Sequence, residues 1–160
     1  MRTIDVMTRW LDPDESRAWR AFLHASRALM ATLDRELQRD AGMPHAYYEI
    51  LVRLSEAPQR RLRMSELAEA TGGSRSRLSH AVARLEEFGW VTRQDCPTDR
   101  RGQVAVLTEQ GFAVLAAAAP GHVAGVRRHL FDHLSRTQVD QLRDICETLV
   151  AHLDPDRRMS

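Results

Sequence analysis

A cluster of cationic and hydrogen-bonding side chains lies between Ser74 and Arg84. Arginine can bind guanine through O6 and N7, and serine can bind base edges or phosphate. Such side chains bind anions best at a helix N-terminus, where free N–H groups and the positive end of the helix dipole attract phosphate. The cluster therefore predicts contact with nucleic acid. Its members are Ser74, Arg75, Ser76, Arg77, Ser79, His80 and Arg84.

The spacing of apolar residues predicts a helix that would present this cluster to solvent. Leu78, Ala81, Val82, Leu85 and Phe88 recur at helical intervals. A shorter helix is expected over 65–71, and a Gly-containing turn joins the two, which is typical of a helix-turn-helix. The second helix of that motif reads bases with its N-terminal residues. The alternative is an ordinary amphipathic helix with a solvated polar face.

A hairpin is expected next, with Trp90–Arg93 running out and Val104–Leu107 running back. Its polar tip carries Asp99, Arg100 and Arg101. Arginine suits a narrow A·T-rich minor groove. Asp99 lies two residues before Arg101, so its carboxylate can hold that guanidinium in one orientation. Arg100 would contact phosphate or remain solvated, and the alternative for the whole tip is a surface turn with a weak ion pair.

Charge is concentrated around these motifs. Residues 58–101 hold nine arginines and six acidic residues, in a chain of net charge +1. Arg60, Arg61 and Arg63 precede the helix-turn-helix and are expected to contact phosphate, to pair with the hairpin or to lie in a solvated loop. The local basic excess favours an anionic partner.

Long helices flank this centre. One is expected over 14–41, a second from Pro44 to before Pro58, a third over roughly 109–134, and a last one capped by Ser135 and Gln138. Pro120 should kink or divide the third. The predicted fold class is mainly α (α+β): a winged helix-turn-helix with long N- and C-terminal dimerisation helices. The single domain, 1–160, would contain dimerisation helices at 14–57 and 109–153 around a winged helix-turn-helix at 58–108.

The hairpin resembles a specific motif of a known protein family. The stretch "DCPTDRRGQVAVLTEQG" resembles the wing of the MarR (multiple antibiotic resistance regulator) family of bacterial transcription factors, which carries Asp-x-Arg, a strand ending in Leu-Thr and a Gly-containing helix start. These are Asp99–Arg101, Leu107-Thr108 and Gly111. "RLEEFGWV" resembles the exit of the family's recognition helix, and the helix order agrees over nearly the whole chain.

The resemblance implies a sequence-specific DNA-binding regulator, expected to be a homodimeric repressor on a pseudo-palindromic operator of double-stranded DNA. Arg101 would enter the minor groove and Asp99 would orient it. It also implies release by a small, aromatic or phenolic effector. Candidate pocket residues are Trp19, His24, His45, Tyr47 and Tyr48. A protein-interaction adaptor without DNA binding is the alternative, although an adaptor has no need of arginines on the recognition helix and wing.

Other function classes find little support. The sequence lacks a Gly-x-Ser-x-Gly elbow, a phosphate-binding Gly-Lys-Ser/Thr loop and a His-Glu-x-x-His motif, so we expect no enzyme and no cofactor. His122, His129 and His133 have spacings that share a helical face, but no metal site is predicted. Cys96 is expected to be a loop thiol, and the alternative is a redox-sensing thiol. No apolar run resembles a membrane span or signal peptide, and a cytoplasmic location without membrane contact is expected.

Overall fold

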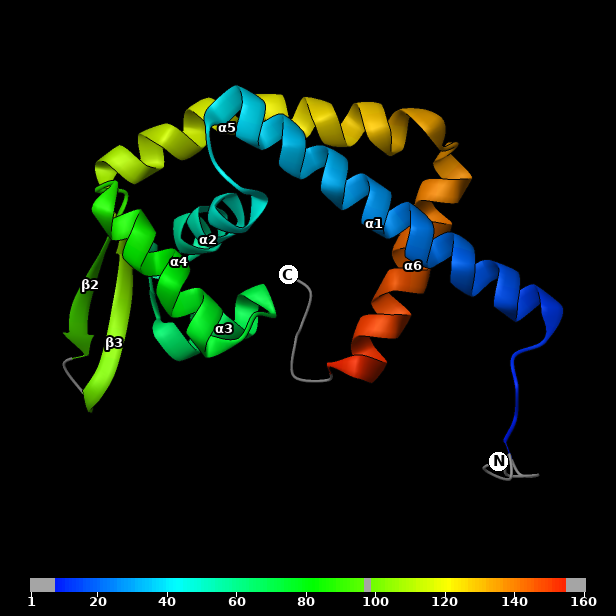
Figure 1. The fold of residues 1–160 in the computed structure, drawn as a ribbon, viewed down its shortest axis with the longest axis horizontal. Helices are drawn as coiled ribbons and strands as arrows, with labels where there is room; N and C mark the ends of the chain where they lie inside the picture. Colours follow the sequence, from blue (N-terminus) through cyan, green and yellow to red (C-terminus); the bar gives the residue numbers. More distant parts are fainter. Residues whose placement is uncertain (1–7, 97–98, 155–160) are drawn as a thin grey trace, which may run out of the picture. The chain divides into compact units, whose positions relative to one another are not determined.

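The computed structural model describes residues 8–96 and 99–154, with the backbone alone described at 99–101. The predicted winged helix-turn-helix with helices at both termini is confirmed (Figure 1). The helices are α1 (Pro13–Ala41), α2 (His45–Glu56), α3 (Met64–Thr71), α4 (Arg75–Glu87), α5 (Glu109–His129) and α6 (Arg136–Leu153). The strands are β1 (Arg61–Arg63), β2 (Val91–Cys96) and β3 (Asp99–Leu107), and the short 3-10 turns are η1 (Pro58–Arg60) and η2 (Phe131–His133).

The chain divides into two compact units, and the boundary falls inside α1, between Thr32 and Leu33. In the first unit, the Asp12 carboxylate accepts hydrogen bonds from the backbone N–H groups of Asp14 and Glu15, at 2.8 Å each. These bonds satisfy two of the donors left free at a helix N-terminus. Trp19 and Phe22 in this part of α1 are more than half exposed.

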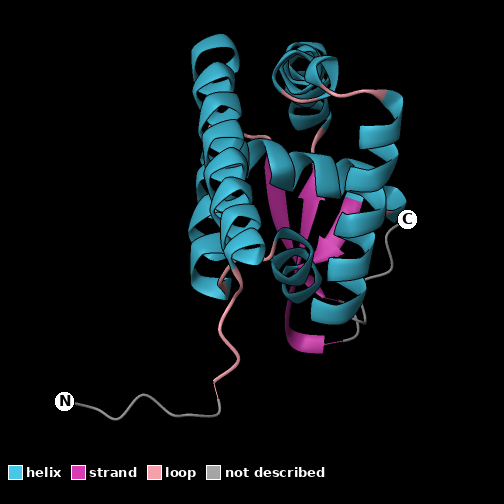
Figure 2. Ribbon diagram, turned by 90° about the vertical axis from the view of Figure 1, so that its right-hand side faces the viewer, coloured by secondary structure: helices cyan, strands magenta, loops and turns pink. Residues whose placement is uncertain are grey.

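The second unit contains a small antiparallel sheet with the strand order β1-β3-β2 (Figure 2). Val91 pairs with Leu107 at the base of the hairpin, and Arg63 of β1 pairs with Val104 on the other side of β3. β2 and β3 extend further toward the tip than the apolar pattern indicates. Backbone hydrogen bonding continues through polar residues there, whose side chains give no strand signal.

The core of this unit forms where α2, α3 and α4 pack on the sheet. Leu51 and Leu54 of α2, Leu67 of α3 and Leu85 of α4 are fully buried. Each buried side chain of this size contributes about 1.5–3 kcal/mol. Because α4 buries Leu85 and its stripe against this core, its opposite face is fixed toward solvent.

The wing is joined tightly to the start of α5. The Thr108 hydroxyl accepts from the backbone N–H of Gly111 at 3.0 Å and donates to the carbonyl of Gly89 at 2.7 Å. A Cβ atom at Gly111 would lie 2.1 Å from the carbonyl oxygen of Trp90, so only glycine fits. This close approach lets α5 begin directly against the turn that links α4 to β2.

A second tie to α5 comes from η1. Gln59 and Arg60 both have φ of +54°, a conformation that costs a non-glycine residue free energy. The turn aims the Arg60 guanidinium at α5, 3.8 Å from the centroid of the Phe112 ring and 3.0 Å from the Glu109 carboxylate. Strain in this short turn is thus offset by contacts that fasten α5 to the region before β1.

α5 runs unbroken through Pro120, although proline forfeits one backbone hydrogen bond. Of the two outcomes expected at this residue, division of the helix is wrong and a kink stays a prediction. Leu115 and Ala118 before Pro120 and Gly125 after it are buried and hold the helix continuous. The helix ends at His129, and His133 belongs to η2, so the single helical face expected for the three histidines is wrong.

α6 begins with the expected capping box of Ser135 and Gln138. None of its residues is buried within the described part of the chain. Ile145, Leu149 and Leu153 of its apolar stripe are between 44% and 75% exposed. An apolar helical stripe of this kind is typical of a surface that another helix covers.

Candidate nucleic-acid interface

The start of α4 is the centre of the candidate interface. The Ser74 hydroxyl accepts from the backbone N–H of Arg77 at 3.2 Å, which confirms the predicted N-cap. Leu78 and Val82 are buried, so the opposite face of α4 is turned toward solvent. Every member of the predicted cluster is exposed: Ser74, Arg75, Ser76, Arg77, Ser79, His80 and Arg84.

The arginines of this face differ in their partners. Within the part of the chain that the structure describes, Arg75 and Arg77 form no ion pair or hydrogen bond through their guanidinium groups. Arg84 is paired with Glu87 and lies 5.4 Å from the Phe88 ring centroid. Unpaired guanidinium groups at a helix N-terminus have the chemistry that phosphate or a base edge requires, whereas Arg84 is partly neutralised.

The C-terminal end of α4 is fastened to the wing. Glu86 accepts from the Arg93 backbone N–H at 2.9 Å and from its Nε at 2.7 Å. Both side chains are only 28% exposed. Glu86 and Glu87 therefore each form an ion pair with an arginine, and the acidic end of α4 carries less unpaired negative charge than its sequence indicates.

A hollow of about 400 Å³ adjoins the start of α4. Arg63, Met64 and Ser65 line one side, Arg75, Leu78 and Ser79 line the second, and Gly102 and Gln103 of β3 line the third. None of these lining residues is acidic. α4, the start of α3 and β3 of the wing therefore meet around a concavity whose charged residues, Arg63 and Arg75, are both basic.

The wing tip is described through its backbone. Asp99, Arg100 and Arg101 lie at the start of β3, with Asp99 opposite Cys96. Their side chains lie outside the described part of the structure, so the expected orientation of Arg101 by Asp99 stays a prediction. The Cys96 side chain is buried.

The three arginines before the helix-turn-helix separate in the structure. Arg61 and Arg63 are exposed on β1, and both pair through their backbones with β3. Arg60 is instead fastened to Glu109 and Phe112 of α5. The expectation of strand pairing with the hairpin is confirmed for Arg61 and Arg63, and Arg60 has a different neighbour.

A second concave feature lies between the C-terminal part of α1 and α5. This α1–α5 cleft has a volume of about 230 Å³. Its lining is mainly apolar, with Leu33 and Leu37 from α1 and Val114 from α5 among its residues. The polar residues that line it are Glu36, Asp40 and His122.

The predicted pocket residues do not line this cleft, but two of them border it through His122. The His45 and Tyr48 rings lie 5.4 and 4.5 Å from the His122 ring, measured between centroids. Tyr47 is half-buried against the core. Trp19 and His24 are exposed on the first unit. Sequence spacing missed Glu36 and Asp40, which look like ordinary solvated residues of a long helix.

His122 is a half-buried polar group that packs against the His45 and Tyr48 rings. Its Nδ1 atom is buried without a hydrogen-bond partner among the described residues. Burial lowers the pKa of His122, and the nearby His45 lowers it further. The ring therefore stays neutral where an exposed histidine would begin to protonate.

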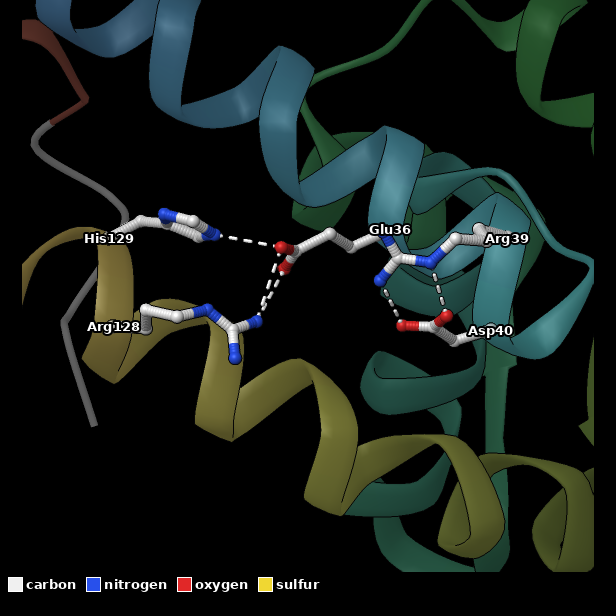
Figure 3. Close-up of polar contacts among 5 residues, drawn as sticks. All are labelled: Glu36, Arg39, Asp40, Arg128 and His129. Atoms are coloured by element: carbon white, nitrogen blue, oxygen red, sulfur yellow. Dashed lines mark hydrogen bonds and ion pairs between the residues drawn. The ribbon is translucent and has the colours of Figure 1, made fainter.

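Glu36, which lines the cleft, pairs with two residues of α5, Arg128 and His129 (Figure 3). The Glu36 carboxylate accepts from Arg128 Nη2 at 3.2 Å and lies 2.8 Å from His129 Nε2. The hydrogen bond from His129 is the main cause that lowers the pKa of Glu36, with Arg128 contributing. A Cβ at Gly125 would lie 2.7 Å from Glu36 Oε2, so a glycine is needed for α5 to approach this carboxylate.

The second carboxylate of the cleft is paired within α1. Arg39 donates from Nε and Nη2 to the two oxygens of Asp40, at 2.6 and 2.7 Å (Figure 3). These hydrogen bonds lower the pKa of Asp40 and raise that of Arg39. Both acidic groups in the lining are thus ionised and already paired with arginines that do not line the cleft.

The described residues hold neither a candidate metal site nor a candidate membrane span. Across residues 8–96 and 99–154, no group of three or more His, Cys, Asp or Glu side chains is placed to hold a metal ion. No helix in the same ranges is long and apolar enough to cross a bilayer.

Comparison with known proteins gives one consistent result. A family model described as "MarR family" matches residues 41–102. The chain is similar to Sco3205 of Streptomyces coelicolor, a MarR family transcriptional regulator whose structure is solved in complex with DNA, with 52% identity, a TM-score of 0.89 and 94% of each chain covered. It is also similar to AbsC from the same organism, with 45% identity, a TM-score of 0.85 and coverage of 91% and 98%. The transcriptional repressor MprA of Escherichia coli K12 is 29% identical over 135 residues, which is 84% of this chain and 76% of that protein.

Proposed function

The chain belongs to the MarR family of transcriptional regulators, and from that premise we propose that it is a homodimeric repressor that binds double-stranded DNA and is released by a small effector. The observation that carries the proposal is the pair of exposed, unpaired guanidinium groups of Arg75 and Arg77 at the N-terminus of α4. Their place beside the basic hollow favours a duplex whose backbone follows that surface.

In the proposed complex, the start of α4 enters the major groove. Arg75 and Arg77 contact base edges or phosphates, and Ser76, Ser79 and His80 supply further hydrogen bonds. The wing lies over the flanking minor groove, where Arg101 enters and Asp99 orients it. Arg84 is the weakest member of the set because Glu87 already neutralises part of its charge.

The exposed apolar stripes support the dimer. Ile145, Leu149 and Leu153 on α6 and Trp19 and Phe22 on α1 are all at least 44% exposed in the single chain. A second copy that covers these stripes would remove them from water. Two-fold symmetry then places two recognition helices about 34–36 Å apart, one turn of DNA, and requires a pseudo-palindromic operator.

The effector is proposed to occupy the α1–α5 cleft. Occupancy would change the separation of α1 and α5, and the start of α5 is fixed to the wing through Thr108 and to η1 through Arg60. A ligand shifts the dimer population away from DNA if it binds more tightly to dimers whose α4 helices are spaced wrongly for the two half-sites of the operator.

Fluorescence anisotropy with the DNA upstream of the protein's own gene tests the proposal. Wild-type affinity should fall steeply with salt, because bound arginines displace counterions. Arg75→Ala and Arg77→Ala should each weaken binding by about 1–3 kcal/mol. Arg136→Ala, which removes an exposed arginine at the start of α6, is the control. Unchanged affinity and salt dependence in both α4 variants would contradict the proposal.

A further inference from the structure

The α1–α5 cleft has a definite chemical character, which follows from its size and lining. Its volume of about 230 Å³ lies below the range of about 300–1,000 Å³ that is usual for drug-sized ligands. Leu33, Leu37 and Val114 give it apolar walls. The dimensions and walls suit a small molecule with a single ring or a short chain.

Among the described residues, the lining of the cleft offers no unpaired charge. Glu36 is bound by Arg128 and His129, and Asp40 is bound by Arg39. No arginine lines the cleft. A bound carboxylate would therefore face two carboxylates without a cation in the lining, and a bound ammonium group would have to compete with Arg128, His129 and Arg39 for the same oxygens. Burial of an unpaired charge is costly, so the lining selects against both.

Among the described side chains that line the cleft, His122 supplies an uncommitted polar group. Its Nδ1 is shut off from solvent without a partner, and its Nε2 has no hydrogen bond among the described residues and is not enclosed. A buried nitrogen without a partner is tolerated better as a bare acceptor than as an orphaned N–H. This preference puts the proton of the neutral ring on Nε2. His122 can thus donate one hydrogen bond to a molecule in the cleft that it lines.

We propose that the α1–α5 cleft selects an uncharged, mainly apolar small molecule that accepts a hydrogen bond from His122 Nε2, and that it rejects carboxylates and amines of the same size. This inference rests on the proposed function in taking the cleft as the effector site. It narrows the aromatic or phenolic effectors expected from the sequence to their neutral members. A neutral amide, ketone or phenol fits, and an aromatic acid does not.

Three compounds of nearly equal shape test the expected selection against charged ligands: benzamide, benzoate and benzylamine. Each is titrated into the full-length protein at pH 7.5 and followed by isothermal titration calorimetry. Benzamide should bind at least tenfold more tightly than benzoate and benzylamine. Equal or tighter binding of benzoate or benzylamine would overturn the proposal, and so would failure of all three to bind at 10 mM.

Variants of His122 test the donor. His122→Phe keeps a ring but removes the N–H, and should weaken benzamide binding at least tenfold. His122→Gln keeps an N–H donor and should restore most of it, which separates loss of the donor from loss of folding. His133→Phe is the control because His133 is exposed in η2. Unchanged benzamide affinity in a folded His122→Phe protein would overturn the assignment of the donor.

The DNA assay keeps this proposal distinct from the proposed function. Binding of benzamide with the expected selectivity, in a protein that binds no DNA, would contradict the regulator and leave the ligand rule intact. DNA binding with a preference for benzoate would contradict the ligand rule and leave the regulator intact.

Discussion

Glu86 at the end of α4 holds Arg93 of β2 through two hydrogen bonds, one to its backbone N–H at 2.9 Å and one to its Nε at 2.7 Å. The pair joins the recognition helix to the first strand of the wing. Because both side chains are more than two-thirds buried, the contact is shielded from water more than a surface ion pair. The two elements that we propose to contact DNA therefore share one polar link.

Loss of this link should destabilise the protein. Glu86→Ala leaves the Arg93 N–H and guanidinium without their acceptor, and we expect the free energy of unfolding to fall by about 1–3 kcal/mol. Glu87→Ala removes an exposed pair with Arg84 and should cost about 0–1 kcal/mol. Urea unfolding followed by circular dichroism measures both. Equal losses would show that the link adds nothing beyond a surface pair.

Gly111 and Gly121 give a matched test on one helix. A Cβ at Gly111 would lie 2.1 Å from the Trp90 carbonyl oxygen, and nothing lies within 4 Å of a Cβ at Gly121. Gly111→Ala should lower the free energy of unfolding by at least about 2 kcal/mol, through strain and overpacking. Gly121→Ala should raise it by up to about 1 kcal/mol, because alanine is the better helix former. Thermal unfolding distinguishes the two, and a stable Gly111→Ala protein would refute the close approach.

The two arginines of the wing tip should differ in sequence dependence. Arg101→Ala should weaken DNA binding by about 1–3 kcal/mol, and the loss should be larger for operators with A·T-rich flanks, since a narrow minor groove attracts arginine. Arg100→Ala should weaken binding to all flanks by a smaller, equal amount. Anisotropy with A·T and G·C flanks makes the comparison. A uniform effect of Arg101→Ala would remove the minor-groove assignment.

His122 should make stability depend on pH. Its pKa is lowered in the folded protein by burial and by His45, with Tyr48 also packed against the ring and Glu36 and Asp40 lining the same cleft. The unfolded chain therefore protonates this histidine first, as the pH falls below about 6.5. The stability that the neutral ring contributes is complete above that pH and is lost as the pH falls toward the folded pKa.

The measurement is urea unfolding at pH 7.5 and pH 5.5. The wild type should lose more stability across this interval than His122→Gln, which has no ionisable group at the position. His133→Gln should follow the wild type. The prediction fails when the wild type and His122→Gln show the same change in the free energy of unfolding.

Local chemistry explains what the sequence could predict. Ser74, Thr108 and Ser135 act as helix caps, as their positions before apolar helical stripes indicate. The exposed face of α4 follows from the same stripe, since burial of Leu78 and Val82 leaves only one direction for the arginines. Each of these features depends on residues a few positions apart.

The sequence did not predict the contacts that join segments far apart in the chain. The cleft brings Glu36 and Asp40 together with His122, and no local pattern relates residues that far apart. The residues selected from the resemblance included His45 and Tyr48, whose rings lie beside His122, because the family's pocket is expected next to the first two helices. A proline in a helix predicts either a kink or a division, and α5 is not divided because packing on either side of Pro120 compensates for the lost hydrogen bond.

Glu36 has two roles. It lines the cleft, and it attaches α1 to α5 through its contacts with Arg128 and His129. A substitution there changes ligand preference and the α1–α5 attachment together. Relatives that adapt to new effectors are therefore expected to diverge first at Val114 and His122, where a change leaves the anchor intact, while Glu36 and Gly125 vary together or not at all.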